Sequence, residues 1–159
     1  MIDFLRSIRF FIRNLIYWLP VLWDDRDWDY NYLLRILIHK LNGMSTNIRE
    51  HGTHVDAEEI ADEIADIAYS IGLVERDVLV DGAVRTHEGR WGQVSFERVP
   101  IDKASYRLHV SYAFAVTPQT IAEANEELDK LLGAAEEQQE RLLRDTFVKM
   151  AEKIWRWWD

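Results

Sequence analysis

Apolar side chains recur at helical spacing in the first stretch of the chain, residues 3–19. Steps of three and four residues place them on one side of a helix, and the set consists of Leu5, Ile8, Ile12, Leu15, Ile16 and Leu19. Three arginines, Arg6, Arg9 and Arg13, fall together on another face. The pattern predicts a basic amphipathic helix that Pro20 ends, because proline lacks the N–H group that a helix interior uses.

The same spacing predicts two further helices, over residues 30–50 and 56–72. Asp27 or Asp29 is the expected cap of the first, because a carboxylate accepts the unpaired N–H groups there, and Gly52 is its expected stop. Its predicted buried stripe is Leu33, Leu34, Leu37, Leu41, Met44 and Ile48. Asp56 is the expected cap of the second, and Gly72 its expected end. Its predicted core residues are Ile60, Ile64, Ile67 and Ile71.

Alternation with period two begins after these helices. Residues 93–99 and 106–114 both alternate apolar and polar side chains, which predicts an antiparallel hairpin. A third strand is expected within residues 78–86. Since a lone hairpin is marginal in water, we expect this one to pack on the helices or to pair with another chain.

A long helical pattern closes the chain. Thr117 followed by Pro118 is a typical helix start, and up to residue 158 only Gly133 interrupts the pattern, so one helix or two joined helices are expected. We predict an α+β fold, predominantly helical, with a small antiparallel β-hairpin or sheet before a long C-terminal helix. We expect a single domain over residues 1–159. It consists of a helical part at 1–76, a hairpin region at 77–117 and the long helix at 118–159.

That long helix also predicts self-association. Its middle, residues 136–141, is polar on all sides, whereas its end is apolar on one side. A polar stretch of helix is typical of a segment that bridges subunits or projects into solvent. We therefore expect a homo-oligomer in which this helix crosses between subunits.

Charge narrows the classes of partner. The net charge of −9 at pH 7 argues against binding to duplex nucleic acid, whose phosphates repel an acidic chain. A basic amphipathic helix either lies on a membrane or packs against acidic protein. Because the rest of the chain is acidic, the sequence favours packing on protein and no membrane partner. The chain has no cysteine, which fits a cytoplasmic location.

Four carboxylates line one face of the third predicted helix: Glu59, Asp62, Glu63 and Asp66. The all-α magnesium-dependent nucleotide pyrophosphatases hold Mg²⁺ with carboxylates on two neighbouring helices, so an enzyme of that type is one alternative. The Glu-Glu-x-x-Glu motif of those enzymes is missing from the preceding helix. A solvated acidic face is the preferred interpretation, and no catalytic residue, metal site or cofactor is predicted.

A cation among aromatic rings suggests a nucleotide-like ligand. Arg26 lies in the sequence beside Trp23, Trp28 and Tyr30, and Arg with Trp can hold a phosphate and stack a base. An Arg–Asp pair that only braces the loop is the competing interpretation. The complete predicted ligand-binding set is Trp23, Arg26, Trp28, Tyr30, Lys40, Arg90 and Trp91.

Three segments resemble a family of small bacteriophage proteins. They are the Trp-rich run at residues 23–30 with Leu33, Leu34 and residues 39–44 after it, the mid-chain turn at residues 88–92, and the Trp-Trp-Asp end at residues 157–159. The resemblance implies a phage accessory protein in the host cytoplasm. The expected function is non-enzymatic counter-defence: capture of a cyclic nucleotide, of cyclic ADP-ribose or of a host defence protein. A structural phage component is a further alternative.

Overall fold

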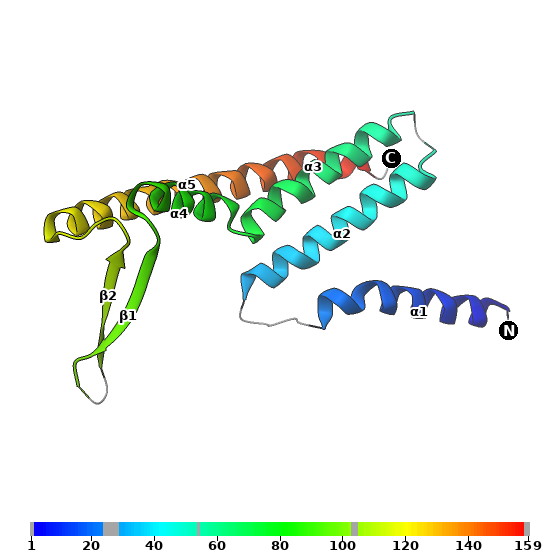
Figure 1. The fold of residues 1–159 in the computed structure, drawn as a ribbon. Coiled ribbons are helices and arrows are strands. Elements are labelled where there is room, and N and C mark those ends of the chain that lie inside the picture. The colour runs from blue at the N-terminus through cyan, green and yellow to red at the C-terminus, as the bar shows by residue number, and fades with distance from the viewer. Residues whose placement is uncertain (1, 24–28, 54, 103–104, 158–159) are drawn as a thin grey trace. The chain divides into compact units, whose positions relative to one another are not determined.

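The computed structural model describes residues 2–23, 29–53, 55–102 and 105–157 (Figure 1). These residues form five α-helices, one two-stranded antiparallel sheet and a short 3₁₀ helix, which confirms the predominantly helical α+β fold. In chain order the elements are α1 (Ile2–Leu22), α2 (Tyr30–His51), α3 (Ala57–Glu75), α4 (Val78–Trp91), β1 (Val94–Pro100), β2 (Tyr106–Tyr112), α5 (Pro118–Lys153) and η1 (Ile154–Trp157).

Contacts divide the chain into two compact units, one of Met1–Glu75 with Asp145–Asp159 and one of Arg76–Arg144. The first unit is built on α2 and α3, which pack side by side in opposite directions (Figure 1). The Ser45 hydroxyl donates to the carbonyl of Ala61 at 2.7 Å, and Arg35 pairs with Glu75 at the other end of the two helices. Their shared core consists of Leu34, Leu41, Ile60, Ile64, Ile67, Ile71 and Val74.

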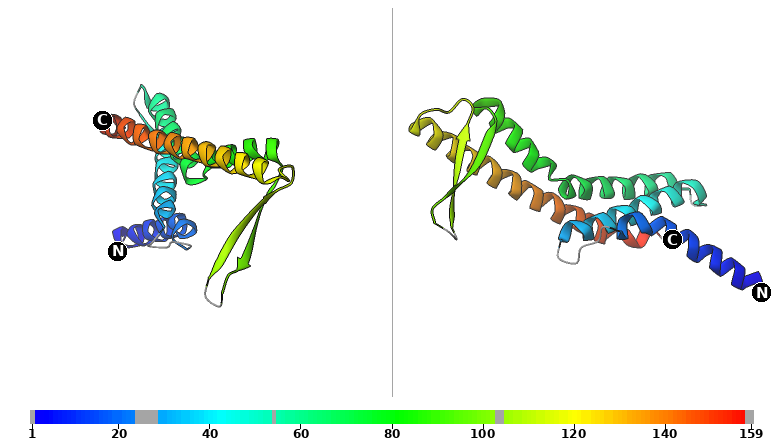
Figure 2. Two further views of the ribbon diagram at one scale, coloured as in Figure 1. Left: turned by 90° about the vertical axis from the view of Figure 1, so that its left-hand side faces the viewer. Right: turned by 60° about the horizontal axis from the view of Figure 1, so that its bottom comes forward.

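The second unit surrounds a small core between α4, the hairpin and the first part of α5. Tyr112, Ala115 and Ala124 are its buried residues. His87 is fully buried beside them, and its Nε2 donates to the carbonyl of Ala124 at 2.9 Å. The hairpin pairs Val94 with Tyr112 and Pro100 with Tyr106, so it confirms the predicted strands. Figure 2 shows the hairpin leading away from α4 and from the start of α5.

The predicted strand within residues 78–86 is wrong, because these residues lie in α4. Its valines favour a strand by propensity, but Leu79, Ala83, His87 and Trp91 follow one another every four residues along the less exposed side of a helix. Gly82 lies on the open side, where an added Cβ would meet no atom within 4 Å. Gly82 therefore does not mark a turn. Residues 88–92, expected as a mid-chain turn, are mainly the end of α4.

Two predicted helix boundaries differ from the structure. Pro20 lies inside α1, whose backbone continues past it as Trp23 donates to the Leu19 carbonyl at 2.9 Å. Loss of one N–H bond is tolerable there, since the helix ends within a turn. Gly72 is buried within α3 rather than at its end. Of the two alternatives left open at Gly133, the structure has the single helix, since α5 continues through this residue.

The predicted stripe of α2 holds except at its beginning. Leu34 and Leu41 are buried, and Asp29 caps the helix by accepting a hydrogen bond from the Asn31 N–H at 2.9 Å. Leu33 is 66% exposed, contrary to the prediction. Its neighbours in sequence, Tyr32 and Leu34, are both buried, so Leu33 is exposed because it lies on a different side of α2 and not because of its place along the helix.

Candidate functional site

Helix α1 has an apolar stripe that is open to solvent along its whole described length. Phe4 and Phe11 are about two-thirds exposed, at 68% and 67%, and Leu15 is 50% exposed. Exposed apolar area that is continuous over several turns is rare on proteins that act alone. The exposed members of the stripe are Phe4, Leu5, Ile8, Phe11, Ile12, Leu15, Ile16, Leu19 and Leu22.

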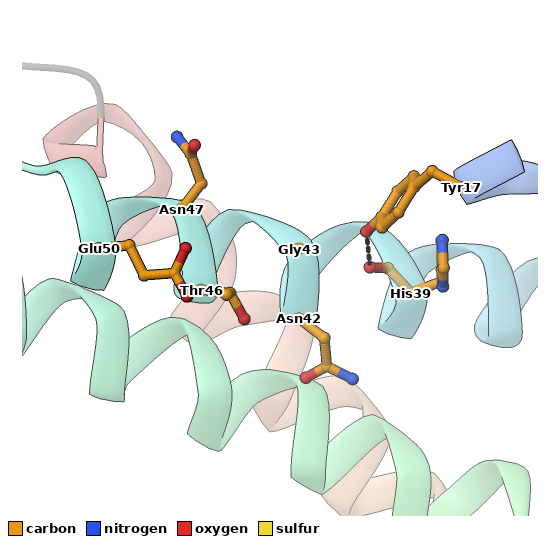
Figure 3. Close-up of a pocket in the computed structure, with 7 residues that line it drawn as sticks. All are labelled: Tyr17, His39, Asn42, Gly43, Thr46, Asn47 and Glu50. Carbon is orange, nitrogen blue, oxygen red and sulfur yellow. Dashed lines mark hydrogen bonds between the residues drawn. The ribbon is translucent and has the colours of Figure 1, made fainter. Parts of the chain in front are cut away.

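One aromatic cluster joins α1 to α2. The Tyr17 hydroxyl donates to the carbonyl of His39 at 2.8 Å (Figure 3), and the centre of its ring lies 4.1 Å from that of the His39 ring. Trp18 adds a second ring contact to His39 at 5.1 Å between centroids. Tyr17 lies on the polar side of α1, so its contact with His39 leaves the apolar stripe exposed to solvent.

Gly43 makes this close approach possible. A Cβ at this position would lie 2.0 Å from the Tyr17 hydroxyl oxygen, so any side chain would displace the ring. Burial raises the pKa of Tyr17 above its ordinary value of 10.0. The phenol is therefore favoured in its neutral, donating form where α1 meets α2.

A polar groove of about 440 Å³ runs along α2 from this cluster. Its lining is Tyr17, His39, Asn42, Gly43, Thr46, Asn47 and Glu50. Figure 3 shows that Asn42 and Asn47 point in different directions and that Glu50 lies far from Tyr17. The polar groups do not converge on one point, as the groups of a small-molecule site generally do.

The basic side of α1 forms a second hollow. Arg6, Arg9, Phe10 and Arg13 line a space of about 230 Å³, and the Arg13 guanidinium lies 4.9 Å from the centre of the Phe10 ring. The spacings of three and four residues bring the arginines to the same side of the helix. Only its Arg9 edge adjoins the apolar stripe, because Arg9 follows Leu5 by four residues and precedes Ile12 by three.

The predicted nucleotide site is only partly visible. Trp23 is 77% exposed just after α1, Tyr30 is 61% exposed at the start of α2, and Lys40 is exposed further along α2. Arg26 and Trp28 lie outside the described residues. Binding of a nucleotide at this set of residues stays a prediction.

Arg90 and Trp91, the other two members of that set, belong to the second unit and share one partner. Glu127 accepts from Arg90 at 2.7 Å and from the Trp91 indole at 3.0 Å. The Arg90 guanidinium also lies 5.0 Å from the centre of the Trp91 ring. These contacts fasten the end of α4 to α5, which is a structural role for both residues.

The acidic face of α3 is partly neutralised by cations. Asp62 pairs with Arg49 of α2, and Glu63 pairs with Lys153 of α5 at 3.3 Å. Within the described parts of the chain, no three His, Asp or Glu side chains are grouped so that they could hold a metal ion. The ion pairs give Asp62 and Glu63 a structural role, and the enzyme alternative stays an untested prediction.

Among the described helices, none has the combination of length and apolar character that crossing a membrane requires. Comparison with protein-family models, with curated proteins and with solved structures finds no match to the chain. The resemblance to bacteriophage proteins therefore stays a prediction.

The sequence pattern indicates some of this surface but not all of it. The apolar spacing and the shared face of the three arginines are legible in residues 3–19, although the sequence favours a covered helix. The contact of Tyr17 with His39 and Gly43 is not legible, because it joins residues more than 20 positions apart. An aromatic residue on the polar side of the helix is the only local signal of it.

Proposed function

We propose that this protein is a non-enzymatic binding protein that attaches to the surface of anionic membranes through α1. The observation that carries the proposal is the open apolar stripe of α1 with three arginines beside it. Helices with one apolar face and a basic polar face lie in the plane of the bilayer interface, with the apolar face among the upper acyl chains. The function is thus recruitment of the rest of the chain to a lipid surface.

The dimensions and side chains of α1 support this orientation. Its 21 residues extend over about 31 Å. The three arginines make it unsuited to the bilayer interior but suited to the headgroup layer, where long cationic side chains reach lipid phosphates. Tryptophan favours the same layer, and Trp23, just beyond the end of α1, is 77% exposed.

The distribution of charge supports an anionic lipid in particular. The first 23 residues contain three arginines and one aspartate, whereas the complete chain has a net charge of −9. Each arginine near an anionic surface contributes about 1 kcal/mol of attraction. The acidic remainder is repelled by the same surface, so the charge pattern itself favours contact through α1.

Packing of α1 on acidic protein is the interpretation that the sequence favours. In the first unit α1 meets α2 through Tyr17 and Trp18, and its apolar stripe stays exposed. A protein partner for this stripe needs an apolar groove about six turns long. A bilayer offers an apolar layer of any length, with phosphates at its border where the arginines lie.

Flotation with lipid vesicles tests the proposal. The purified full-length protein should float with vesicles that contain phosphatidylglycerol and should float weakly with vesicles of phosphatidylcholine alone. Leu15→Asp should reduce binding by roughly 10- to 100-fold, because burial of one leucine contributes about 1.5–3 kcal/mol. Added salt should weaken binding, since it screens the arginines.

Leu33→Asp provides the matched control. Leu33 is as exposed as the residues of the stripe but lies on α2, so this variant should float like the parent. The proposal is wrong if the parent protein stays in the aqueous fraction with both kinds of vesicle. Equal loss in the two variants would also contradict it, because the effect would then not depend on α1.

A further inference from the structure

We infer that the hollow formed by Arg6, Arg9, Phe10 and Arg13 binds the phosphate of a lipid headgroup and prefers a phosphomonoester, as in phosphatidic acid, to a phosphodiester. The inference rests on the proposed membrane attachment and deepens it. Attachment needs only an apolar stripe and positive charge, whereas this site would select the headgroup.

The placement of the arginines suits one phosphate group. Arg9 follows Arg6 by three residues and Arg13 follows Arg9 by four, so the side chains rise along one side of the helix over about 10 Å. The hollow of about 230 Å³ between them exceeds the size of a phosphate and leaves room for its water. Its Arg9 edge adjoins the apolar stripe, since Arg9 follows Leu5 by four residues and precedes Ile12 by three. Headgroup phosphates lie at this border when the stripe is among acyl chains.

The Arg13 guanidinium is held so that its donors stay available. The central carbon of the Arg13 guanidinium lies over the Phe10 ring, 4.9 Å from its centre. This contact uses no hydrogen-bond acceptor, so the N–H groups of Arg13 remain available for a bidentate contact with two phosphate oxygens. None of the three arginines forms an ion pair with a carboxylate among the described side chains.

The preference for a phosphomonoester follows from charge and acceptor number. A phosphomonoester carries a charge of about −1.5 to −2 near neutral pH and has three terminal oxygens. A phosphodiester carries one charge and two terminal oxygens. Three guanidinium groups around one hollow can use the third oxygen and the additional charge.

Two sets of vesicles test the inference. One contains phosphatidic acid and the other phosphatidylglycerol, in phosphatidylcholine, with fractions chosen to give equal surface potential. The parent protein should bind the phosphatidic acid vesicles about 10-fold more tightly, the effect of roughly one additional charge-assisted hydrogen bond.

Substitution by lysine separates geometry from charge. The double variant Arg9→Lys with Arg13→Lys keeps both charges but loses the planar donors, so it should bind both kinds of vesicle and lose most of the preference. The control is Arg85→Lys with Arg141→Lys, two exposed arginines of α4 and α5, which should keep the preference.

The outcomes distinguish this inference from the proposed function. Equal binding of the parent protein to both vesicles overturns the inference and leaves membrane attachment standing. Binding to neither overturns both. A preference that survives in the Arg9 and Arg13 variant shows that another part of the chain selects the headgroup.

A soluble phosphate is the other source of the same chemistry. Calorimetric titration of the parent protein with inorganic phosphate, without vesicles, should give no measurable heat, because the apolar insertion that strengthens lipid binding is then missing. Measurable binding that the Arg9 and Arg13 variant loses would assign the hollow to a soluble phosphate and overturn the lipid assignment.

Discussion

His87 shows how a polar side chain can organise a small core. Its side chain is fully buried, and its ring lies 5.3 Å from that of Tyr112. Because a carbonyl oxygen can only accept, the hydrogen bond to Ala124 requires a proton on Nε2. The Tyr112 hydroxyl in turn donates to Asn125 at 2.6 Å. Two hydrogen bonds thus fasten α4 and β2 to α5 where few apolar residues are available.

Replacing His87 should therefore destabilise the second unit. His87→Ala removes a buried ring and the hydrogen bond that it donates to the Ala124 carbonyl, so we expect a loss of roughly 2–4 kcal/mol in the free energy of unfolding. Urea unfolding measured by circular dichroism tests this. His109→Ala, at an exposed position of β2, is the control and should change stability by less than about 0.5 kcal/mol. Equal effects of the two variants would contradict the role assigned to His87.

The role of a single residue can be predicted from the sequence only where its partner lies a few positions away in the chain. The cap at Asp29 is predictable because its hydrogen bond reaches Asn31, two residues away. The Arg90–Glu127 and Trp91–Glu127 contacts are not predictable, because α4 and α5 must first be brought together by the core. Arg90 and Trp91 therefore resemble a ligand site in the sequence, although in the structure both donate to Glu127.

At the scale of elements, the period of two predicts strands correctly in one segment and wrongly in another. Period two correctly predicts the hairpin, since both strands alternate over seven residues. The pattern misses α4 because three valines in residues 78–84 imitate a strand. Its helical side becomes visible only when His87 and Trp91 are counted among the core residues. Capping and periodicity predict α2, α3 and α5 because each has a long apolar stripe or a clear start.

The contact between α1 and α2 depends on a few groups and should be sensitive to pH. Burial holds the pKa of Tyr17 above its ordinary value of 10.0, so the docked state favours the neutral phenol. The stability that this residue contributes is complete below pH 10 and is lost as pH rises through the raised pKa. Ionisation also removes the hydrogen bond that Tyr17 donates to the His39 carbonyl.

An absorbance titration of the phenolate, comparing the parent protein with Tyr17→Phe, measures this contact. The difference between the two curves should show one group with a midpoint above 10. In Gly43→Ala the added methyl would displace the Tyr17 ring, so the midpoint of that group should fall toward 10. Gly82→Ala, where a Cβ meets no atom within 4 Å, should leave it unchanged. A midpoint at or below 10 in the parent protein would contradict the docked arrangement.

For the whole molecule, charge and apolar surface are distributed unevenly. The basic helix α1 is followed by a chain with a large acidic excess, and long-range repulsion between acidic chains opposes association. Apolar surface is nevertheless exposed outside α1. In the last turns of α5 and in η1, Val148 is 52% exposed and Trp155 is 78% exposed. The two residues are seven positions apart, which places them on the same side of a helix.

This second apolar surface, at the end of α5 and in η1, is where we expect the predicted homo-oligomer to form. We expect two or more copies to associate through the end of α5, because burying a valine and a tryptophan from each copy is favourable and α1 is not needed for it. Light scattering at micromolar concentration should give a mass of two or more times 18.8 kDa.

Val148→Asp should shift the mass toward that of a single chain, because it places a charge in the contact. Val116→Asp, at a valine that is 80% exposed in the second unit, should leave the mass unchanged. A mass of one chain for the parent protein would show that the exposed end of α5 does not hold copies together, and the prediction of a homo-oligomer would then be wrong.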